Sequence, residues 1–156
     1  MQLGLFPKLD TEKLKAGKDN CPCCGRLMRA YCKTLDARLV ELLHEIYQYC
    51  REKNNPVFQP RTIWNDNHHK INDFQKLHYW GFISRYEDKT ASWKLRQFGI
   101  DFLKGKVKSP VRLWVFDNKV IDRDEHLVTI SEIAPRWQIQ RSDFAMDYVR
   151  QSIIQG

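Results

Sequence analysis

The sequence predicts an α+β fold, and three neighbouring segments support this prediction. An apolar stripe that begins at Ile71 predicts a short helix over residues 70–80, and Gly81 ends it because glycine readily adopts a helix C-cap conformation. Residues 82–95 hold two runs of aromatic and β-branched residues around a polar turn, which predicts a hairpin. Residues 97–103 are expected to be helical again.

This order of helix, glycine stop, charged hairpin and closing helix is typical of a winged helix-turn-helix core. The flanking sequence predicts a zinc-knuckle element before this core and a β-hairpin and helix appendage after it. A chain of 156 residues has room for one main domain with its own hydrophobic core. We therefore expect an irregular leader at 1–20, a zinc-knuckle element at 21–34, a winged-helix domain at 35–105 and the appendage at 106–156.

The zinc-knuckle element is predicted from cysteine spacing. Cys21 and Cys24 are separated by two residues, and a tight turn of this length directs both thiolates at one metal ion, while Gly25 allows the turn to close. Cys32 is the preferred third ligand, because it could return on the far strand of a small hairpin. The sequence predicts a structural zinc ion on these three cysteines and leaves the remaining ligand open among Cys23, Cys50, His44, His68 and His69.

The first helix of the core is predicted over residues 35–53, where apolar residues recur every three or four positions. Thr34 or Asp36 would cap its start, and Asn54-Asn55-Pro56 would end it. One short helical turn around residues 62–66 is expected next. His68, His69 and Lys70 then open the third helix with three donors that could contact phosphates.

The outward side of that third helix has the chemistry for contacting DNA bases. At about 100° per residue, Asn72, Lys76 and Tyr79 lie opposite the apolar stripe, with Gln75 beside them. Asn and Gln amides pair with adenine edges, and Lys reaches guanine or phosphate, so these four residues form the predicted reading face in the major groove.

The hairpin would act as the wing of this core. Trp93 and Leu95 are expected to point into the core, whereas Arg85, Lys89 and Lys94 are predicted to contact DNA phosphates. The chain carries a net charge of +7 with a pI near 9.2, which fits a polyanionic partner. Basic residues concentrate between positions 89 and 112, and acidic residues between 117 and 132.

The appendage begins with a second predicted hairpin, whose strands are residues 111–116 and 120–121. A third strand at 127–130, a short helix from Ser131 and a last helix from Ser142 or Asp143 complete it. The appendage is expected to pack on the winged helix or to support a homodimer.

Several classes of protein are disfavoured by the composition. No apolar run is long enough to span a membrane, and the first twenty residues lack the apolar core of a secretory signal, so a cytosolic protein without a membrane partner is expected. The five cysteines are then expected to be thiols or metal ligands. The sequence shows no paired carboxylates, glycine-rich phosphate cradle or nucleophile motif, so a non-enzyme is predicted.

Three short motifs resemble those of a family of small, largely uncharacterised phage and prophage proteins. They are a Cys-Pro-x-Cys-Gly knuckle from Cys21, a Lys-Leu-x-x-Trp-Gly-x-Ile segment from Lys76 and a Gly-x-x-Phe-x-x-Gly segment from Gly99. The resemblance covers about residues 21–146. It implies a zinc-knuckle and winged-helix architecture, a phage protein in the cytoplasm of a bacterial host, and no catalytic residues.

Two functions are expected from these patterns. In the first, the chain is a phage regulator of transcription that binds double-stranded DNA, with the reading face in the major groove and the wing on phosphates. In the second, it binds a host protein and inhibits a host enzyme or an anti-phage defence complex, in the manner of anti-CRISPR proteins. Exposed Trp64, Tyr79 or Trp80 would then anchor the host–virus interface.

Overall fold

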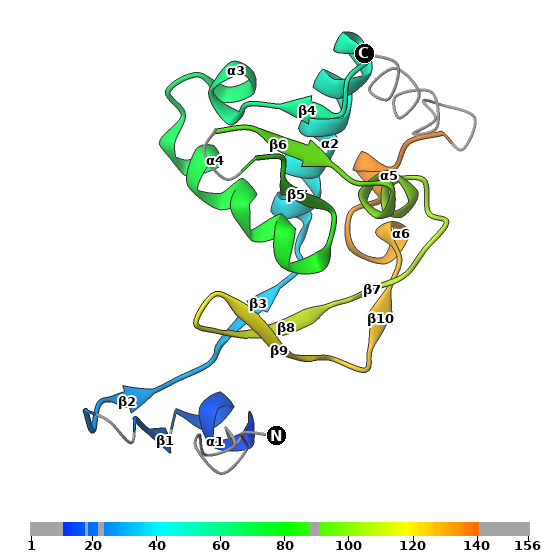
Figure 1. Cartoon of the computed structure of the whole chain (residues 1–156). Helices are drawn as coiled ribbons and strands as arrows, with labels where there is room; N and C mark the ends of the chain where they lie inside the picture. Colours follow the sequence, from blue (N-terminus) through cyan, green and yellow to red (C-terminus); the bar gives the residue numbers. More distant parts are fainter. Residues whose placement is uncertain (1–10, 18, 22–23, 88–90, 141–156) are drawn as a thin grey trace, which may run out of the picture. The chain divides into compact units, whose positions relative to one another are not determined.

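The computed structural model describes residues 11–17, 19–21, 24–87 and 91–140, and it shows an α+β protein with small antiparallel sheets (Figure 1). The chain divides into two compact units. Unit 1 contains the described residues of Met1–Thr34 and Arg112–Glu125, and unit 2 contains those of Leu35–Val111 and His126–Gly156. The expected boundary after residue 34 coincides with a limit of the units, whereas the expected boundary after residue 105 lies inside unit 2.

Unit 2 begins with α2 (Ala37–Lys53), the long helix that apolar periodicity predicts. Of the two candidate caps, Asp36 is the one that acts: its carboxylate accepts a 3.0 Å hydrogen bond from the Leu39 amide. The helix ends at Asn54, which has a φ of 52° and donates its amide to Arg51 and Cys50 carbonyls. Local sequence signals therefore set both ends of α2.

The remainder of the predicted core follows α2 in an alternating order of short helices and strands. The elements in chain order are β4 (Val57–Phe58), α3 (Pro60–Trp64), α4 (His68–Asp73), η1 (Phe74–Trp80), β5 (Ile83–Arg85), β6 (Trp93–Leu95) and α5 (Gln97–Leu103). The three strands form one antiparallel sheet in the order β4-β6-β5. The helix α5 has the predicted bounds, and the short helix expected around residues 62–66 begins earlier, at Pro60.

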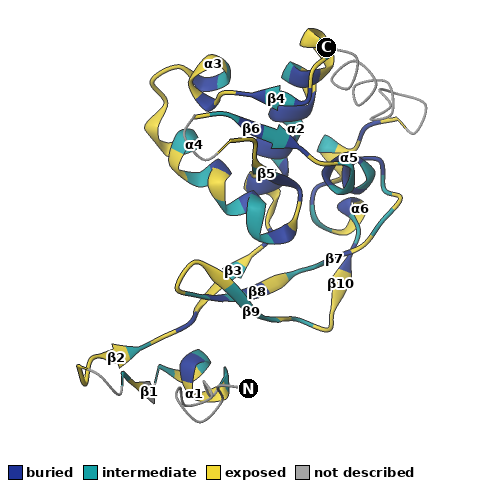
Figure 2. Ribbon diagram, viewed as in Figure 1, coloured by how far each residue is buried: buried dark blue, intermediate teal, exposed yellow. Residues whose placement is uncertain are grey.

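Buried residues lie along α2 and the strands of this sheet (Figure 2), and an aromatic cluster joins the sheet to the short helices. Phe74 lies at its centre, with ring centroids 5.2 Å from Trp93, 5.3 Å from Trp64 and 6.2 Å from Phe58. All four rings are buried. Trp93 and Leu95 both point into the core, as their alternation along the strand predicts. The cluster fixes η1 against the sheet.

Unit 2 closes with a second two-stranded sheet and two short helices. These are β7 (Ser109–Pro110), β10 (Leu127–Val128), α6 (Ile130–Ile133) and the 3₁₀ turn η2 (Pro135–Trp137). The strand expected at 127–130 was predicted to extend the second hairpin, but β10 pairs with β7 instead. Thr129 and Glu132 form a capping box at the start of α6. The last predicted helix, from residue 142, lies outside the described residues.

Unit 1 is built around a three-stranded sheet. Its elements are α1 (Thr11–Ala16), β1 (Asp19–Asn20), β2 (Leu27–Met28), β3 (Tyr31–Thr34), β8 (Arg112–Phe116) and β9 (Lys119–Arg123), with β3-β8-β9 as the sheet order. Asp117 and Asn118 form the predicted hairpin turn, both with positive φ. The leader was predicted to be irregular, and this is wrong for residues 11–16: they form a helix because Leu14 finds a fully buried position.

Candidate functional site

The segment predicted as one recognition helix is two different helices. α4 is a short α-helix, and η1 continues it as a 3₁₀ helix with three residues per turn. The apolar residues Ile71, Phe74, Leu77 and Trp80 recur every three positions, which matches the 3₁₀ period better than the α period of 3.6. The last three are buried as one row, and Gly81 ends the helix with a φ of 83°. The prediction assigned this three-residue spacing to the apolar stripe of an α-helix, although it fits the 3₁₀ period better.

This change of period rearranges the predicted reading face. In a 3₁₀ helix, residues three positions apart lie above one another, so Gln75 and Tyr79 fall on different rows. Asn72 and Gln75 are exposed, whereas Lys76 and Tyr79 are half-buried. The Lys76 ammonium lies 3.4 Å from the Asp73 carboxylate, which also pairs with Arg38 at 2.7 Å. The basic charge of the reading face is therefore partly compensated within the protein.

The basic residues predicted for the wing differ in how far their side chains are exposed to a partner. Arg85 is exposed at the end of β5, and its guanidinium lies 5.1 Å from the centroid of the Trp93 ring. Lys94 is half-buried on the central strand, opposite Val57 and Ser84. Lys89 lies outside the described residues. Within the described hairpin, Arg85 is therefore the basic side chain most open to a partner.

A pocket of about 240 Å³ opens between α3, α4, η1 and the wing. Its apolar floor includes Phe74 and Trp93, and two exposed arginines, Arg61 and Arg85, line its edge. Its lining residues are Gln59, Pro60, Arg61, Ile71, Phe74, Gln75, Arg85, Ala91 and Trp93, none of which is acidic. The pocket brings two predicted site residues, Gln75 and Arg85, to one place.

Gln59 and Arg61 were not predicted as site residues. Pro60 stands at the first turn of α3, a position that proline favours because its φ is already helical. That local signal could have located the helix start and the residues beside it. It could not show that the wing would come to lie against them, since that depends on the pairing of β4 with β6.

A carboxylate on α2 holds the helices of this site in place. Glu45 accepts a 2.5 Å hydrogen bond from the Trp64 indole and a 2.7 Å bond from the Lys70 ammonium. Lys70 was predicted to be available for phosphates, but this ion pair occupies it. His68 and His69 are exposed beside it.

Two of the three predicted protein-binding anchors are core residues. Trp64 and Trp80 are 7% and 6% exposed, because each ring packs inward and its indole N–H has an internal acceptor. Trp80 donates to the Pro110 carbonyl at 2.8 Å. Tyr79 is half-buried. The expectation that the tryptophans are exposed was wrong.

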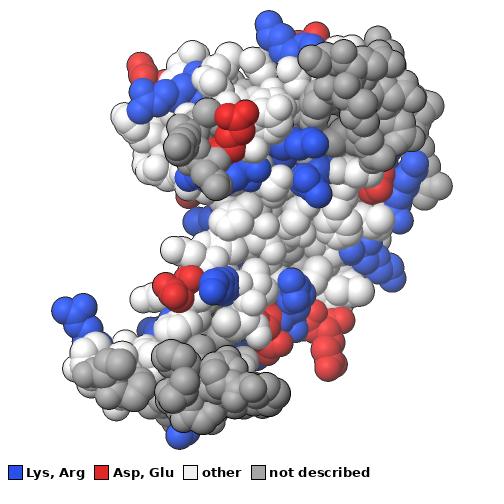
Figure 3. Space-filling model, viewed as in Figure 1, with Lys and Arg blue, Asp and Glu red and all other residues white. Residues whose placement is uncertain are grey.

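The lysines that follow α5 are also less exposed, taken together, than the composition of this segment suggests. Lys104 is only 4% exposed, whereas Lys106 and Lys108 are exposed. Figure 3 shows Lys and Arg side chains spread over the visible face of unit 2, with Asp and Glu side chains at separate places. The basic surface is therefore discontinuous.

Two backbone hydrogen bonds join Cys21 to the residues that follow Cys24 in unit 1. The Cys21 amide donates to the Arg26 carbonyl at 2.7 Å, and the Gly25 amide donates to the Cys21 carbonyl at 2.9 Å. Gly25 has a φ of 74°, in the left-handed region that favours glycine. Cys24 is exposed.

The other candidate ligands lie on separate elements. Cys32 is exposed on β3, which pairs with β8. Among the described residues, no group of three or more His, Cys, Asp or Glu side chains is placed to hold a metal ion. Cys23 lies outside those residues. Cys50 is fully buried, its thiol faces the Pro56 carbonyl at 3.6 Å, and burial raises its pKa to about 12.

His44, a further candidate ligand, packs among aromatic rings of unit 2. Its ring centroid lies 5.2 Å from that of Trp137 and 6.3 Å from that of Tyr47. Burial lowers the pKa of His44, since desolvation disfavours the imidazolium. These contacts favour a packing role for the ring.

The helices in the described part of the chain are all too short or too polar to cross a membrane. Comparison of the chain with protein-family models, with curated proteins and with solved structures finds no match.

Proposed function

We propose that the chain binds double-stranded DNA through a winged-helix core. The observation that carries the proposal is the order α2-β4-α3-α4/η1-β5-β6-α5 together with the strand order β4-β6-β5. The short helices α3 and α4/η1 precede the hairpin formed by β5 and β6. The second strand of that hairpin, β6, pairs with β4, which lies before the helices in the chain. This is the arrangement in which a helix is presented to the major groove and a hairpin lies beside it.

The exposed side chains divide into two roles in the proposed complex. Asn72 and Gln75 are exposed amides, suited to hydrogen bonding with base edges. Arg61 and Arg85 are exposed guanidinium groups on the flanking elements, suited to phosphate oxygens. Because Asp73 compensates Lys76, α3 and the wing supply most of the phosphate contacts in this proposal. A net charge of +7 supports association with a polyanion.

The proposed setting is that of a phage regulatory protein in a bacterial cytoplasm. The motifs from Cys21, Lys76 and Gly99 support that setting. A structural zinc ion at the knuckle is part of the proposal, which is supported by the two-residue spacing of Cys21 and Cys24 and by the Gly25 amide bond to the Cys21 carbonyl. Cys21, Cys24 and Cys32 are its proposed ligands.

Duplex binding is tested by charge reversal at the two arginines. The double variant Arg61→Glu/Arg85→Glu is compared with Lys119→Glu/Arg123→Glu, which makes the same charge change at exposed positions of unit 1. Affinity for a random-sequence duplex is measured by fluorescence anisotropy over a salt series. If each arginine contacts one phosphate, the first variant lowers the slope of log K against log salt by about 2. Equal slopes in the two variants would exclude these phosphate contacts.

Base contacts are tested separately with Asn72→Ala and Gln75→Ala. After selection of a preferred site from a random library, each substitution should reduce discrimination at one base pair by about 1–3 kcal/mol. The affinity for random duplex should stay nearly unchanged. A uniform loss across all sequences would assign these amides to the backbone instead.

The second candidate function is binding to a host protein. We base it on Leu27 and Tyr31, two large apolar side chains of unit 1 that are 62% and 61% exposed and would supply apolar area to an interface. The double variant Leu27→Asp/Tyr31→Asp should then lose a stoichiometric partner that wild type retains after nuclease treatment. Recovery of the same partner with both proteins would exclude this surface.

A further inference from the structure

The pocket between α3, α4, η1 and the wing has a composition that selects its ligand. Phe74 and Trp93 are buried beneath it, at 1% and 6% exposure, and their rings pack edge to face with centroids 5.2 Å apart. Arg61 and Arg85 line it from opposite elements, one from α3 and one from β5. Since no acidic residue is among the described lining residues, the occupant of the pocket should be an anion with a flat apolar body.

Two amide side chains narrow the class of ligand further. Gln59 and Gln75 also line the pocket, and each carries a donor and an acceptor. Their present bonds are long: Gln59 lies 3.5 Å from the Ser92 hydroxyl, and Gln75 lies 3.4 Å from the Ile71 carbonyl. Such bonds are readily exchanged for those of a ligand. A flat ring with donors and acceptors on its edge, joined to a phosphate, satisfies the floor, the amides and the arginines together.

The geometry points to a single nucleotide as the occupant: we infer that the pocket binds one unpaired nucleobase with its 5′-phosphate. A cavity of about 240 Å³ lies just below the range of drug-sized ligand sites, so it suits one nucleotide rather than a dinucleotide cofactor. The Arg85 guanidinium already makes a cation–π contact with Trp93, 5.1 Å from the ring centroid, so a base in the pocket would lie beside an arginine and an aromatic ring.

This inference goes beyond duplex binding, because a paired base cannot enter a pocket. The nucleotide could come from a free mononucleotide or from an unpaired position in a strand, and the chemistry recognised is the same. Both sources would place a phosphate between Arg61 and Arg85, the residues proposed to contact duplex phosphates. A bound nucleotide would therefore compete with duplex DNA for the two arginines.

The test uses the full chain and two substitutions at exposed lining positions. Gln75→Glu places an acid in the pocket, and Ala91→Leu fills part of it while leaving both arginines intact. Gln48→Glu is the matched control, since it makes the same chemical change at an exposed position on α2. Circular dichroism establishes that all three variants fold.

Binding is measured by calorimetry with adenosine and thymidine 5′-monophosphates, a single-stranded oligothymidylate, a blunt duplex, adenosine and inorganic phosphate. Saturable binding of the mononucleotides, or of the single strand alone, is expected for wild type and for Gln48→Glu. Binding should weaken by about ten-fold or more in Gln75→Glu and Ala91→Leu, a loss typical of like-charge placement or of steric exclusion. Mononucleotide binding identifies a free ligand, and binding of the strand alone identifies an unpaired position.

Two results with the wild-type protein would overturn the inference. One is the absence of binding by both the mononucleotides and the single strand; the other is inorganic phosphate or adenosine binding as tightly as the nucleotide. Unchanged nucleotide binding in the two pocket variants would overturn it equally. Duplex affinity distinguishes a failure of this inference from a failure of the proposed function: Ala91→Leu should retain duplex binding, whereas Arg61→Glu/Arg85→Glu should weaken it.

Discussion

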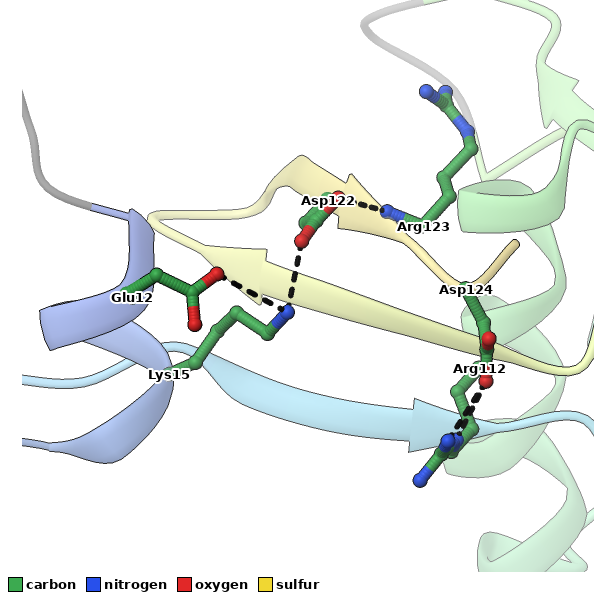
Figure 4. Close-up of polar contacts among 6 residues, drawn as sticks. All are labelled: Glu12, Lys15, Arg112, Asp122, Arg123 and Asp124. Carbon is green, nitrogen blue, oxygen red and sulfur yellow. Dashed lines mark hydrogen bonds and ion pairs between the residues drawn. The ribbon is translucent and has the colours of Figure 1, made fainter. Parts of the chain in front are cut away.

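The Lys15 ammonium on α1 donates a 2.8 Å hydrogen bond to the Asp122 carboxylate on β9, 107 positions along the chain (Figure 4). The same ammonium lies 3.8 Å from the centroid of the Trp114 ring on β8 and 3.8 Å from a Glu12 carboxylate oxygen. A second pair, Arg112 with Asp124 at 2.8 Å, joins β8 to the chain beyond β9. Within unit 1, the Lys15 side chain therefore joins α1 to the hairpin through two contacts, one to each strand.

Replacing Lys15 with Met should destabilise the protein by about 1 kcal/mol, since it removes a partly exposed ion pair and a cation–π contact. The free energy of unfolding is measured by urea denaturation. Lys119→Met, at an exposed position of the same hairpin, is the control and should change stability by less than about 0.5 kcal/mol. Equal effects of the two substitutions would show that the Lys15 contacts add nothing.

The ion pair between Lys15 and Asp122 predicts that the stability of the protein depends on pH. The Lys15 hydrogen bond, followed by the Arg123 backbone amide, lowers the pKa of Asp122, and the Asp122 bond raises the pKa of Lys15. A lowered carboxyl pKa contributes stability above the ordinary carboxyl range, and this is lost as the pH falls through the folded-state value. Asp122→Asn should therefore narrow the stability difference between about pH 7 and about pH 3. An unchanged difference would contradict the prediction.

Metal content tests the proposed zinc site. Protein purified without added metal should carry zinc in a one-to-one ratio, and Cys24→Ser or Cys32→Ser should lose it. Cys50→Ser is the control that should retain zinc, because the Cys50 thiol is fully buried in the core of unit 2. Elemental analysis gives the ratio directly. Wild-type protein without zinc would exclude the site, and zinc in Cys32→Ser would remove Cys32 from the ligand set.

The cysteines should also differ in reactivity. Burial raises the pKa of Cys50 to about 12, so its thiolate is scarce at neutral pH and its sulfur is shielded. In the metal-free native protein, iodoacetamide should modify the exposed Cys24 and Cys32 first and Cys50 only after denaturation. Peptide mass spectrometry over a time course identifies each site. Modification of Cys50 at the rate of Cys32 would show that this part of unit 2 opens readily.

Gly99 on α5 is required by close packing rather than by its backbone conformation. A Cβ there would lie 2.8 Å from the Phe82 carbonyl oxygen and 3.3 Å from a Leu43 methyl carbon. Gly99→Ala should therefore destabilise the protein by about 1–3 kcal/mol, although alanine favours a helix by about 1 kcal/mol. Thermal and chemical denaturation measure the change, with the exposed Gln48→Ala as control. A more stable Gly99→Ala would show that α5 shifts freely.

The sequence predicted the elements whose signals are local. Apolar periodicity and a capping aspartate define α2, because a helix depends on residues three and four positions apart and on its own ends. Gly81 ends η1 and the Asp117-Asn118 pair forms a hairpin turn for the same reason: each residue adopts a conformation that its own side chain allows. The bounds of α5 were predicted correctly on the same basis.

Tertiary structure decided which segments meet. The pairing of β4 with β6, of β3 with β8 and of β7 with β10 joins segments far apart in the chain. Strands as short as β4, β7 and β10, with two residues each, carry no periodicity that could reveal their partners. The 3₁₀ form of η1 arises as Phe74, Leu77 and Trp80 pack in one buried row.

In the candidate site, too, the sequence determined the side-chain types and the tertiary structure determined which of them meet. The sequence by itself selected Asn72, Gln75 and Arg85 as polar or basic residues beside an apolar stripe. Only the folded chain brought Gln59 and Arg61 to one pocket with Gln75 and Arg85, and committed Lys70 to an ion pair with Glu45. Side-chain type is a local property, whereas the partner that compensates a charge, or the second arginine that completes a pocket, is supplied by long-range packing.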